Sequence, residues 1–263
     1  MFRGRTVAVV IPAYNERDKI AATIRSVPGY VDHILVVDDG SADGTAAAAR
    51  RQAGRRRGGV VEVLRHEVNR GVGAAIASGY ARAVALGVQV TAVMAGDGQM
   101  DPADLPRLLE PVAAGRADYV KGNRFAWPGG WRRMPRARMV GNLLLSLATR
   151  VASGYWRLLD SQCGYTAASR PALLAIAPQK MFARYGYPND LLARLGAAGA
   201  RVVDVPVRPV YGPAWRSGLR PARVALPIAL LLARACWRRL WTRRGARALE
   251  ALAPLAEPLG DGT

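Results

Sequence analysis

The stretch VVDDGSADGT, residues 36–45, is an apolar run that ends in two adjacent carboxylates, Asp38 and Asp39, followed by a glycine. A second stretch, VMAGDGQMDP at 93–102, has the same layout. Apolar runs without alternation predict strands buried on both faces, as in a parallel sheet. Ligands of such sheets bind beyond the carboxyl ends of the strands, so these acidic side chains are expected at a binding site.

Apolar runs and helical stretches alternate through the first half of the chain. Strands are predicted at 6–12, 33–39, 60–65 and 90–95, and helices at 17–27, 44–53, 71–87 and 101–112. Ser41 or Asp43 is the expected N-cap of the second helix. Strand and helix in alternation predict an α/β fold, with a mostly parallel central sheet that helices cover on both faces.

The second half of the chain is less regular. A strand is expected within 117–125, and the Gly-, Pro- and Trp-rich segment 125–135 is expected to be a mobile loop. Apolar residues at helical spacing predict a helix over 137–153. The segment 201–211 alternates apolar and polar residues, and its prolines restrict it to the edge of a sheet.

The chain carries 38 lysines and arginines against 19 acids over 263 residues, a formal net charge of +19. No acid occurs between Tyr119 and Leu159, a stretch that holds seven arginines and one lysine. Such a surface attracts phosphorylated ligands, nucleic acid or an anionic membrane. Nucleic acid is disfavoured, because the tryptophans near the C-terminus lie among leucines instead of on a polar surface.

Two cysteines, Cys163 and Cys236, give no disulfide framework in a chain of this length, which favours a reducing compartment. The longest apolar run, VALPIALLLA at 224–233, is too short to span a bilayer. It leads into a stretch with Trp237 and Trp241, where apolar residues are interleaved with arginine. This pattern fits a helix that lies on an anionic membrane, or an amphipathic helix that packs on the core. We therefore expect a cytoplasmic protein, held peripherally on the cytoplasmic face of the membrane.

Asp97 and Gln99 follow the strand predicted at 90–95 and are two residues apart, so both side chains can point into one cleft. A carboxylate and an amide oxygen suit Mg²⁺ or Mn²⁺, which take their remaining ligands from water and substrate phosphates. The alternative is an ordinary turn, because Asp-Gly and Asp-Pro are common turn formers. Likewise, Asp38 and Asp39 could accept hydrogen bonds from a nucleobase or a ribose, or could complement the dipole of the next helix.

Arg124 follows a predicted strand and Arg138 begins a predicted helix, and guanidinium groups bind phosphate through paired hydrogen bonds. A solvated basic surface is the alternative for either arginine, and the acid-free stretch around them favours anion binding. The stretch NRGVGAAIASG at 69–79 looks like a dinucleotide-binding fingerprint, but Ile76 occupies the position of its third glycine. A nicotinamide-dependent dehydrogenase is therefore disfavoured.

Six motifs together resemble those of the family 2 glycosyltransferases with a GT-A fold: VVIPAYNE (9–16), VVDDGSADGT (36–45), NRGVGAAIASG (69–79), MAGDGQMDP (94–102), KGNRF (121–125) and DSQCGYTA (160–167). The chain is most similar to the polyprenyl-phosphate (dolichyl-phosphate) hexose synthases, from about Val7 to Gly218. The resemblance implies a Rossmann-like, mostly parallel sheet. It also implies a metal-dependent inverting enzyme that moves a hexose from GDP-mannose or UDP-glucose to a polyprenyl phosphate.

The resemblance assigns residues to the donor site. The nucleotide sugar would be bound by Pro12, Tyr14, Glu16, Val37, Asp39, Ala95, Gly96, Asp97 and Arg216. Asp39 would read the nucleotide, whereas Asp38 would brace the turn. Asp97 and Gln99 would hold Mg²⁺ or Mn²⁺, although Ala95 stands where the family's Asp-x-Asp motif has its first aspartate.

The resemblance also assigns catalytic roles, to Asp97, Arg124 and Arg138. The two arginines would bind phosphate, and Arg216 with Ser217 would lie in a mobile loop over the diphosphate. A lipid phosphate is already an oxyanion and needs positioning more than a general base. A sugar hydroxyl acceptor would instead require a carboxylate base. Asp190 is the candidate for that base, and Asp160 is a second that could equally orient the loop.

The expected organisation is a GT-A catalytic domain at 1–218, an amphipathic basic membrane-associating segment at 219–247 and a flexible tail at 248–263. Two alternatives to the lipid-phosphate enzyme remain at this point. One is a family 2 glycosyltransferase acting on a sugar hydroxyl. The other is a non-catalytic protein that binds nucleotides or other anions on a degenerate GT-A domain, in which Ala95 marks the loss of activity.

Overall fold

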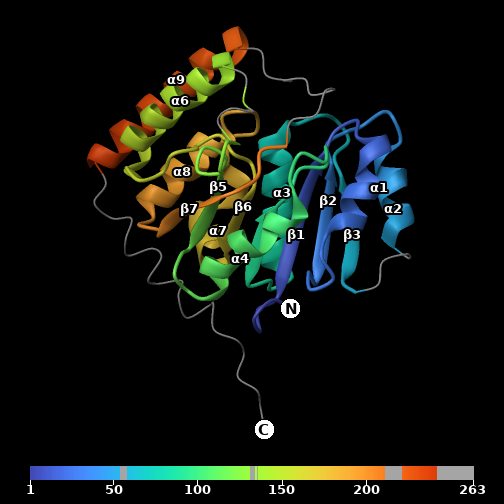
Figure 1. Ribbon diagram of the computed structural model, residues 1–263. Helices are drawn as coiled ribbons and strands as arrows, with labels where there is room; N and C mark the ends of the chain where they lie inside the picture. The colour runs from blue at the N-terminus through green and yellow to red at the C-terminus, as the bar shows by residue number, and fades with distance from the viewer. Residues whose placement is uncertain (54–57, 131–133, 135, 211–220, 242–263) are drawn as a thin grey trace.

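The computed structural model describes residues 1–53, 58–130, 134, 136–210 and 221–241. A seven-stranded sheet lies at its centre, with the strand order β3-β2-β1-β4-β6-β5-β7 (Figure 1). The strands are β1 (Val7–Ala13), β2 (His33–Asp38), β3 (Val60–Arg65), β4 (Val90–Val93), β5 (Tyr119–Asn123), β6 (Thr166–Ser169) and β7 (Val202–Pro206).

Helices cover both faces of the sheet. They are α1 (Arg17–Ser26), α2 (Thr45–Ala53), α3 (Val72–Ala85), α4 (Leu105–Ala113), α6 (Arg136–Ser153), α7 (Arg170–Ile176), α8 (Tyr187–Ala197) and α9 (Pro221–Trp241), with short 3₁₀ turns η1 (Pro102–Asp104) and η2 (Pro178–Lys180). Successive side chains of a strand point to opposite faces. Val9 of β1 therefore belongs to the core cluster that includes residues of α1, α2 and α4, and Val10 belongs to the cluster that includes residues of α3, α7 and α8. Each such fully buried valine stabilises the fold by about 1.5–3 kcal/mol.

The strand directions bring distant motifs to one edge of the sheet. β1 pairs in parallel with β2 and β4, so these three strands end at the same edge. β6 runs antiparallel to both β4 and β5, so β5 also ends at this edge and β6 begins there. We call this the carboxyl edge: the residues that follow β1, β2, β4 and β5 and those that precede β6. Five of the six sequence motifs contribute residues to it, and NRGVGAAIASG lies at the start of α3.

The structure confirms the α/β prediction and the edge position of β7. The fourth strand is shorter than predicted and ends at Val93, because the chain then turns into the acidic segment. Strand β6 was not predicted. Its sequence, TAAS, has little β-propensity, and it is strand only because β4 and β5 pair with it on both sides. Asp43, and not Ser41, accepts the Thr45 N–H at the start of α2, at 2.9 Å.

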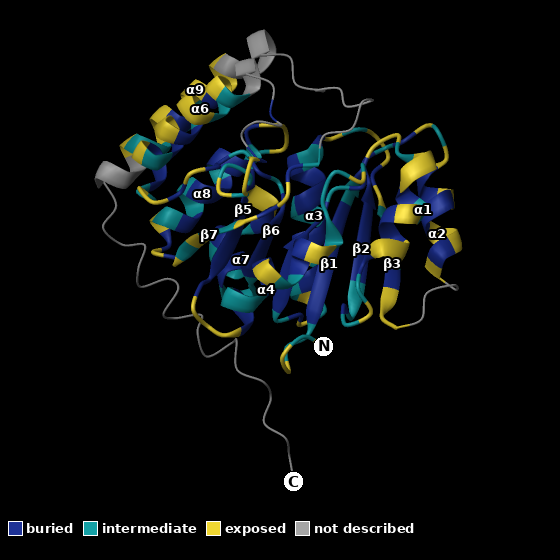
Figure 2. Ribbon diagram, in the orientation of Figure 1, coloured by how far each residue is buried: buried dark blue, intermediate teal, exposed yellow. Residues whose placement is uncertain are grey.

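Helices α6 and α9 lie side by side along one side of the molecule, next to α8 (Figure 1). Ala152 of α6 packs with Ile228 and Leu232 of α9, so part of α9 is buried against the rest of the protein. The opposite surface of the pair is exposed (Figure 2). Among the described residues, no helix has the length and apolar character needed to cross a membrane. The predicted boundary at 218 lies outside the described residues, as do 247 and the tail, and the division into 1–218, 219–247 and 248–263 stays a prediction.

Candidate active site

A cavity of about 310 Å³ lies at the carboxyl edge. It is formed by the end of β1, the first residue after β2, the start of α3 and the segment that precedes α8. The residues that line it are Pro12, Ala13, Tyr14, Asp39, Asn69, Gly71, Val72, Ala75, Arg184 and Tyr185. The structure thus brings together Pro12, Tyr14 and Asp39, three of the residues predicted to bind the nucleotide. The volume of the cavity lies within the range of small-molecule binding sites.

The carboxylate of Asp39 is held rigidly at the wall of this cavity. Its Oδ1 lies 2.7 Å from Nδ1 of His66 and accepts the Arg70 N–H at 2.9 Å, and its Oδ2 accepts the Gly71 N–H at 2.7 Å. The other ring nitrogen of His66 lies 2.9 Å from the hydroxyl of Ser78. A carboxylate has about four lone-pair sites. Asp39 therefore keeps room for about one more hydrogen bond, such as one from a ribose or base donor.

Three other residues of the same motifs do not line the cavity. Asp38 is fully buried and accepts the Ser41 N–H at 3.3 Å, which is the turn-bracing contact expected of it. Val37 is fully buried in the core beneath the edge. Glu16 precedes α1, and its carboxylate lies 3.1 Å from the ammonium of Lys19. The nucleotide-binding roles of Val37 and Glu16 stay predictions.

The acidic turn after β4 is tied directly to this cavity. The Gly96 N–H donates to the carbonyl of Pro12 at 3.2 Å, and the Gly96 carbonyl accepts the hydroxyl of Thr23 at 3.2 Å. Oδ1 of Asp97 accepts the Gln99 N–H at 3.0 Å, and Gly98 between them has a φ of +74° that favours glycine. Asp97 thus begins a closed turn one residue away from the wall of the cavity.

The oxygen donors of this turn fit a hard divalent cation only if substrate completes the ligand set. Asp97 supplies one carboxylate, and Gln99 can supply an amide oxygen. Ala95, whose N–H donates to the sulfur of Met100, adds no side-chain ligand. In the part of the chain that the structure describes, no three His, Cys, Asp or Glu side chains are grouped as a metal site. Such a sparse set matches Mg²⁺ or Mn²⁺ bound jointly with phosphate oxygens.

Arg124 lies at the same edge, immediately after β5, in a buried ion pair with Asp160. Nε and Nη2 of the guanidinium donate to the two carboxylate oxygens at 2.7 and 2.9 Å, and the Arg124 N–H donates to Oδ2 at 3.2 Å. Burial alone would raise the pKa of Asp160, but the charge and hydrogen bonds of Arg124 outweigh it and lower the pKa. Asp160 therefore holds Arg124 in a fixed orientation, the loop-orienting role considered for it from the sequence.

A buried lysine lies next to this ion pair. Lys121 is 1% exposed, and its ammonium donates a hydrogen bond to the carbonyl of Cys163. Desolvation lowers the pKa of Lys121 to about 8, against the attraction of nearby anionic groups such as Asp160. Positive charge therefore lies in the interior next to the carboxyl edge and favours the binding of an anionic ligand at that edge.

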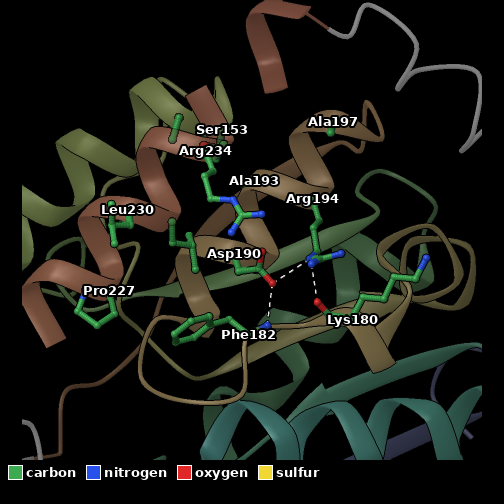
Figure 3. Close-up of a pocket in the computed structure, with 13 residues that line it drawn as sticks. Ser153, Lys180, Phe182, Asp190, Ala193, Arg194, Ala197, Pro227, Leu230 and Arg234 are labelled. Atoms are coloured by element: carbon green, nitrogen blue, oxygen red, sulfur yellow. Dashed lines mark hydrogen bonds and ion pairs between the residues drawn. The ribbon is translucent and has the colours of Figure 1, made fainter. Parts of the chain in front are cut away.

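The structure does not bring Asp190 to the acidic turn. Its Oδ2 accepts the Phe182 N–H and the Arg194 Nε–H, both at 2.8 Å, in a second cavity that neither Asp97 nor Asp39 lines (Figure 3). In these contacts Asp190 orients the segment before α8. Arg138 belongs to α6, but its side chain is outside the described part of the molecule.

Arg216 and Ser217 also lie outside the described residues, as does part of the predicted loop 125–135. Their roles stay predictions.

The glycines of the NRGVGAAIASG motif have a packing role. A Cβ on Gly71 would approach the Ala183 carbonyl to 2.6 Å, and one on Gly73 would approach the Phe182 carbonyl to 2.1 Å. The Ala74 N–H donates to the same Ala183 carbonyl at 2.9 Å. Small residues at the start of α3 therefore let segment 182–185 close one side of the cavity that Asp39 lines.

The residues of this site that are absent from the sequence-based prediction include His66, Arg184 and Tyr185. His66 follows the last residue of β3, so the rule that pointed to Asp39 and Asp97 also covers it. Nothing in the sequence around Arg184 and Tyr185 marks them, because their position depends on contacts with α3.

The model of the glycosyl transferase family 2 domain matches residues 8–176. The UDP-N-acetylglucosamine–dolichyl-phosphate N-acetylglucosaminyltransferase of Methanococcus voltae is 30% identical over 218 residues, covering 79% of this chain and 86% of that protein. The undecaprenyl-phosphate mannosyltransferase of Micrococcus luteus is 33% identical over 204 residues, covering 76% and 82%. The polyprenol monophosphomannose synthase of Mycolicibacterium smegmatis is 35% identical over 208 residues, covering 76% and 75%.

Among solved structures, glucosyl-3-phosphoglycerate synthase from Mycobacterium tuberculosis, crystallised with Mn²⁺, UDP and glucosyl-3-phosphoglycerate, superposes with a TM-score of 0.65. It is 24% identical and covers 89% of this chain and 80% of its own. This likeness concerns the fold alone, and it confirms the GT-A architecture expected from the motifs.

Proposed function

The chain belongs to glycosyl transferase family 2, and from this premise we propose that it is a metal-dependent, inverting enzyme that transfers a hexose from a nucleotide sugar to a polyprenyl phosphate at a membrane surface. One observation carries the donor half of the proposal. Pro12, Tyr14 and Asp39 line one cavity, and the hydrogen bond from Gly96 to Pro12 joins that cavity to the turn of Asp97.

The nucleoside would occupy the cavity and the diphosphate would extend toward Asp97. Tyr14, which is 49% exposed, is available to stack on the base, and the remaining lone pair of Asp39 would accept a ribose hydroxyl. Arg184 and Tyr185 close the other side and add one cation and one aromatic ring. The sugar itself is best identified with a panel that contains GDP-mannose, UDP-glucose and UDP-N-acetylglucosamine, because the relatives are named for the transfer of different sugars.

The carboxylate of Asp97 and the amide oxygen of Gln99 would hold Mg²⁺ or Mn²⁺ together with the diphosphate. The bound cation would stabilise the negative charge of the leaving nucleoside diphosphate. The hydrogen bond from the Gln99 N–H keeps Oδ1 of Asp97 in place before the ligands arrive. Arg124, held by Asp160, would place positive charge on the acceptor side of the same edge.

The names of the relatives and the position of Asp190 both support a polyprenyl phosphate as the acceptor. Three relatives are named for transfer to dolichyl, undecaprenyl or another polyprenyl phosphate. An oxygen of the acceptor phosphate would attack C1 of the hexose, and the bond from C1 to the nucleoside diphosphate would break with inversion. No proton has to be removed from a phosphate oxyanion, so the reaction does not need Asp190, which lies in another cavity.

The membrane surface would be met by helices α6 and α9. The exposed apolar face of this pair comprises Val140, Leu143, Leu144, Leu147 and Val151 of α6 and Leu226, Leu230 and Trp237 of α9. Contiguous exposed apolar side chains on a basic protein are typical of an interfacial membrane contact. The sequence-based prediction placed membrane binding in segment 219–247 and did not include α6. The exposed leucines of α6 add to the apolar surface of α9. The cytoplasmic face of the membrane remains the predicted location.

Radiolabelled nucleotide sugars and vesicles that contain polyprenyl phosphate test the proposal. Label should pass into an organic-extractable, acid-labile lipid when Mn²⁺ or Mg²⁺ is present. Asp97→Asn should reduce this transfer by about two to three orders of magnitude, with an unchanged circular dichroism spectrum. Asp101→Asn is the matched control, since Asp101 belongs to the same segment and pairs with Arg208. Transfer to a water-soluble acceptor, but never to the lipid, would refute the acceptor.

A further inference from the structure

Helix α6 buries hydroxyl groups on its inner side and exposes leucines on its outer side. Ser146 and Thr149 are buried, whereas Leu144 and Leu147 are exposed. An ordinary surface helix has the opposite arrangement, because its apolar stripe packs on the core and its polar residues face water. The proposed membrane contact accounts for the exposed leucines. It does not account for the buried hydroxyls, and neither does the proposed chemistry of transfer.

The buried hydroxyls belong to a hydrogen-bond network that joins α6 to α8 and to the segment before β6. The Thr149 hydroxyl donates to Oδ1 of Asn189 at 2.7 Å, and Nε2 of Gln162 donates to the same oxygen at 2.9 Å. The hydroxyls of Ser146 and Ser161 lie 3.1 Å apart, and the Ser161 N–H donates to the Ser146 hydroxyl at 3.0 Å. Nε2 of Gln162 also donates to the Ser161 hydroxyl at 2.7 Å, which joins the two parts. We call these residues together the α6 network.

The segment that the α6 network holds also contains the carboxylate that orients Arg124. Asp160 is fully buried, and its Oδ1 accepts the Gln162 N–H at 3.2 Å and Nη2 of Arg124 at 2.9 Å. On the other side of Asp160 along the chain, the Leu158 carbonyl accepts Nε of Arg150, a residue of α6, at 2.6 Å. Helix α6 therefore holds the chain on both sides of Asp160, and the position of this carboxylate depends on the position of the helix.

Hydrogen bonds of this kind fix a register that apolar packing alone would leave open. Nδ2 of Asn189 is buried and has no hydrogen-bond partner within the described part of the chain, so the network persists despite a cost in free energy. Lipid on the outer side of α6 supplies no directional contacts, so only the inner side can fix the helix along its axis. A shift by one helical turn, about 5.4 Å, would move the turn that contains Arg138 by that distance relative to Arg124.

We propose that the α6 network has a positioning role: it fixes the register of α6 and, through Asp160, the orientation of the Arg124 guanidinium. The members of the network would not touch the substrates themselves. None of them lines the cavity that contains Asp39, so the donor half of the site should not depend on them. The consequence for the acceptor phosphate rests on the proposed function, whereas the coupling of α6 to Arg124 does not.

NMR spectroscopy of the full chain, labelled with ¹⁵N-arginine, tests the coupling without any substrate. The Nε–H of Arg124, assigned through its own backbone, should exchange slowly with water because its carboxylate partner is buried. T149V/Q162M removes both donors to Oδ1 of Asn189 and nearly keeps the side-chain shapes, and it should accelerate this exchange about tenfold or more. Thr149→Ser, which retains the hydroxyl, should exchange as the unchanged protein does. Ser153→Ala is the matched control, because its hydroxyl is also buried on α6 but donates to a carbonyl of the same helix.

Transfer kinetics test the consequence for the acceptor. In T149V/Q162M, kcat/KM for polyprenyl phosphate should fall about tenfold or more, mainly through KM, because a small misplacement of a binding group costs much of its effect. The KM of the nucleotide sugar, and the Kd of the nucleoside diphosphate with Mn²⁺, should not change. A merely structural role would instead reduce the amount of folded enzyme, and with it kcat alone. Thr149→Val, which leaves the Gln162 bond in place, should give intermediate values if the double variant folds poorly.

Three results would overturn the proposal. The first is an unchanged exchange rate of the Arg124 Nε–H in both Thr149→Val and T149V/Q162M. The second is an equal acceleration in Ser153→Ala, which would show that any lost hydroxyl loosens α6. The third is an equal rise in KM for donor and acceptor, which would show that the network supports the whole site. If the exchange responds as expected but the unchanged protein transfers no sugar, the proposed function is refuted and the coupling of α6 to Arg124 stands.

Discussion

The buried ion pair between Asp160 and Arg124 should contribute strongly to the stability of the fold. Asp160→Asn keeps the shape of the side chain but removes the charge that faces the guanidinium at 2.7 and 2.9 Å. Arg124, whose side chain is 11% exposed, and the buried Lys121 would then remain in the interior without that carboxylate. Removing one partner of a buried ion pair costs about 3–5 kcal/mol, because the other charge stays buried. Domains are stable by about 5–15 kcal/mol in total, so the loss should be large.

Urea denaturation at pH 7, followed by far-UV circular dichroism, measures the loss. Glu62→Gln is the matched control, because Glu62 also receives two hydrogen bonds from one arginine, Arg82, but the side chains of that pair are 30% and 40% exposed. An exposed pair of this kind contributes about 0.2–1 kcal/mol. The double variant R124M/D160N removes both charges and should recover much of the lost stability, giving a coupling energy of about 2–3 kcal/mol.

The dependence on pH distinguishes the ion pair from mere packing. The folded-state pKa of Asp160 lies below the value of about 4 that an unfolded aspartate has. Its stabilising contribution is therefore complete above about pH 4 and disappears as the pH falls through the lowered pKa. The difference in stability between the unchanged protein and Asp160→Asn should shrink accordingly in acid. A loss no larger than that of Glu62→Gln, or one that does not change with pH, refutes the electrostatic account.

Three further predictions concern other parts of the molecule. Desolvation lowers the pKa of Lys121 from 10.5 to about 8, so the proton that Lys121 holds below pH 8 destabilises the folded state by about 3 kcal/mol. This destabilisation disappears as the pH rises from 8 to 10.5. In urea denaturation, Lys121→Met should therefore be more stable than the unchanged protein at about pH 7 and should lose that advantage by pH 10.5. His66→Gln should weaken nucleoside diphosphate binding in calorimetry about threefold to tenfold, because Asp39 loses one of three hydrogen bonds while two backbone N–H groups still hold it; unchanged affinity would show that His66 does not position Asp39. The double variant L144D/L230D should no longer float with anionic liposomes. Val60→Asp, at a similarly exposed valine of the edge strand β3, far from α6 and α9, should still float.

The sequence predicts most of the sheet because burial on both faces leaves a pattern that can be read locally. Residues 33–38 and 60–65 are strands in the structure, as their apolar runs predict. Strand β6 leaves no such pattern, since TAAS pairs through its backbone between two neighbours whose positions the local sequence does not encode. Tertiary pairing, and not propensity, decides that segment.

The candidate site was predictable to the extent that it follows strand ends. Pro12 and Asp39 lie in one cavity because β1 and β2 are parallel neighbours, and Asp97 adjoins them because β4 pairs with the other side of β1. Asp190 shows where this reasoning stops. It lies within helix α8 and does not follow the end of a strand, and its carboxylate is held by Phe182 and Arg194 in a different cavity.

The segment between η2 and α8 shows why the two cavities have to be considered together. Gly71 and Gly73 permit its carbonyls to approach α3, and any side chain there would push the segment away from the cavity that Asp39 lines. On its other side, the Phe182 N–H is fixed by Asp190 in the wall of the second cavity. The segment is therefore packed between the cavity lined by Asp39 and the cavity lined by Asp190. A shift of its backbone on one side must change the contacts on the other, because packed segments rearrange as units. The glycines that look like a dinucleotide fingerprint thus have a physical reason to be small, and that reason lies in the packing between the two cavities.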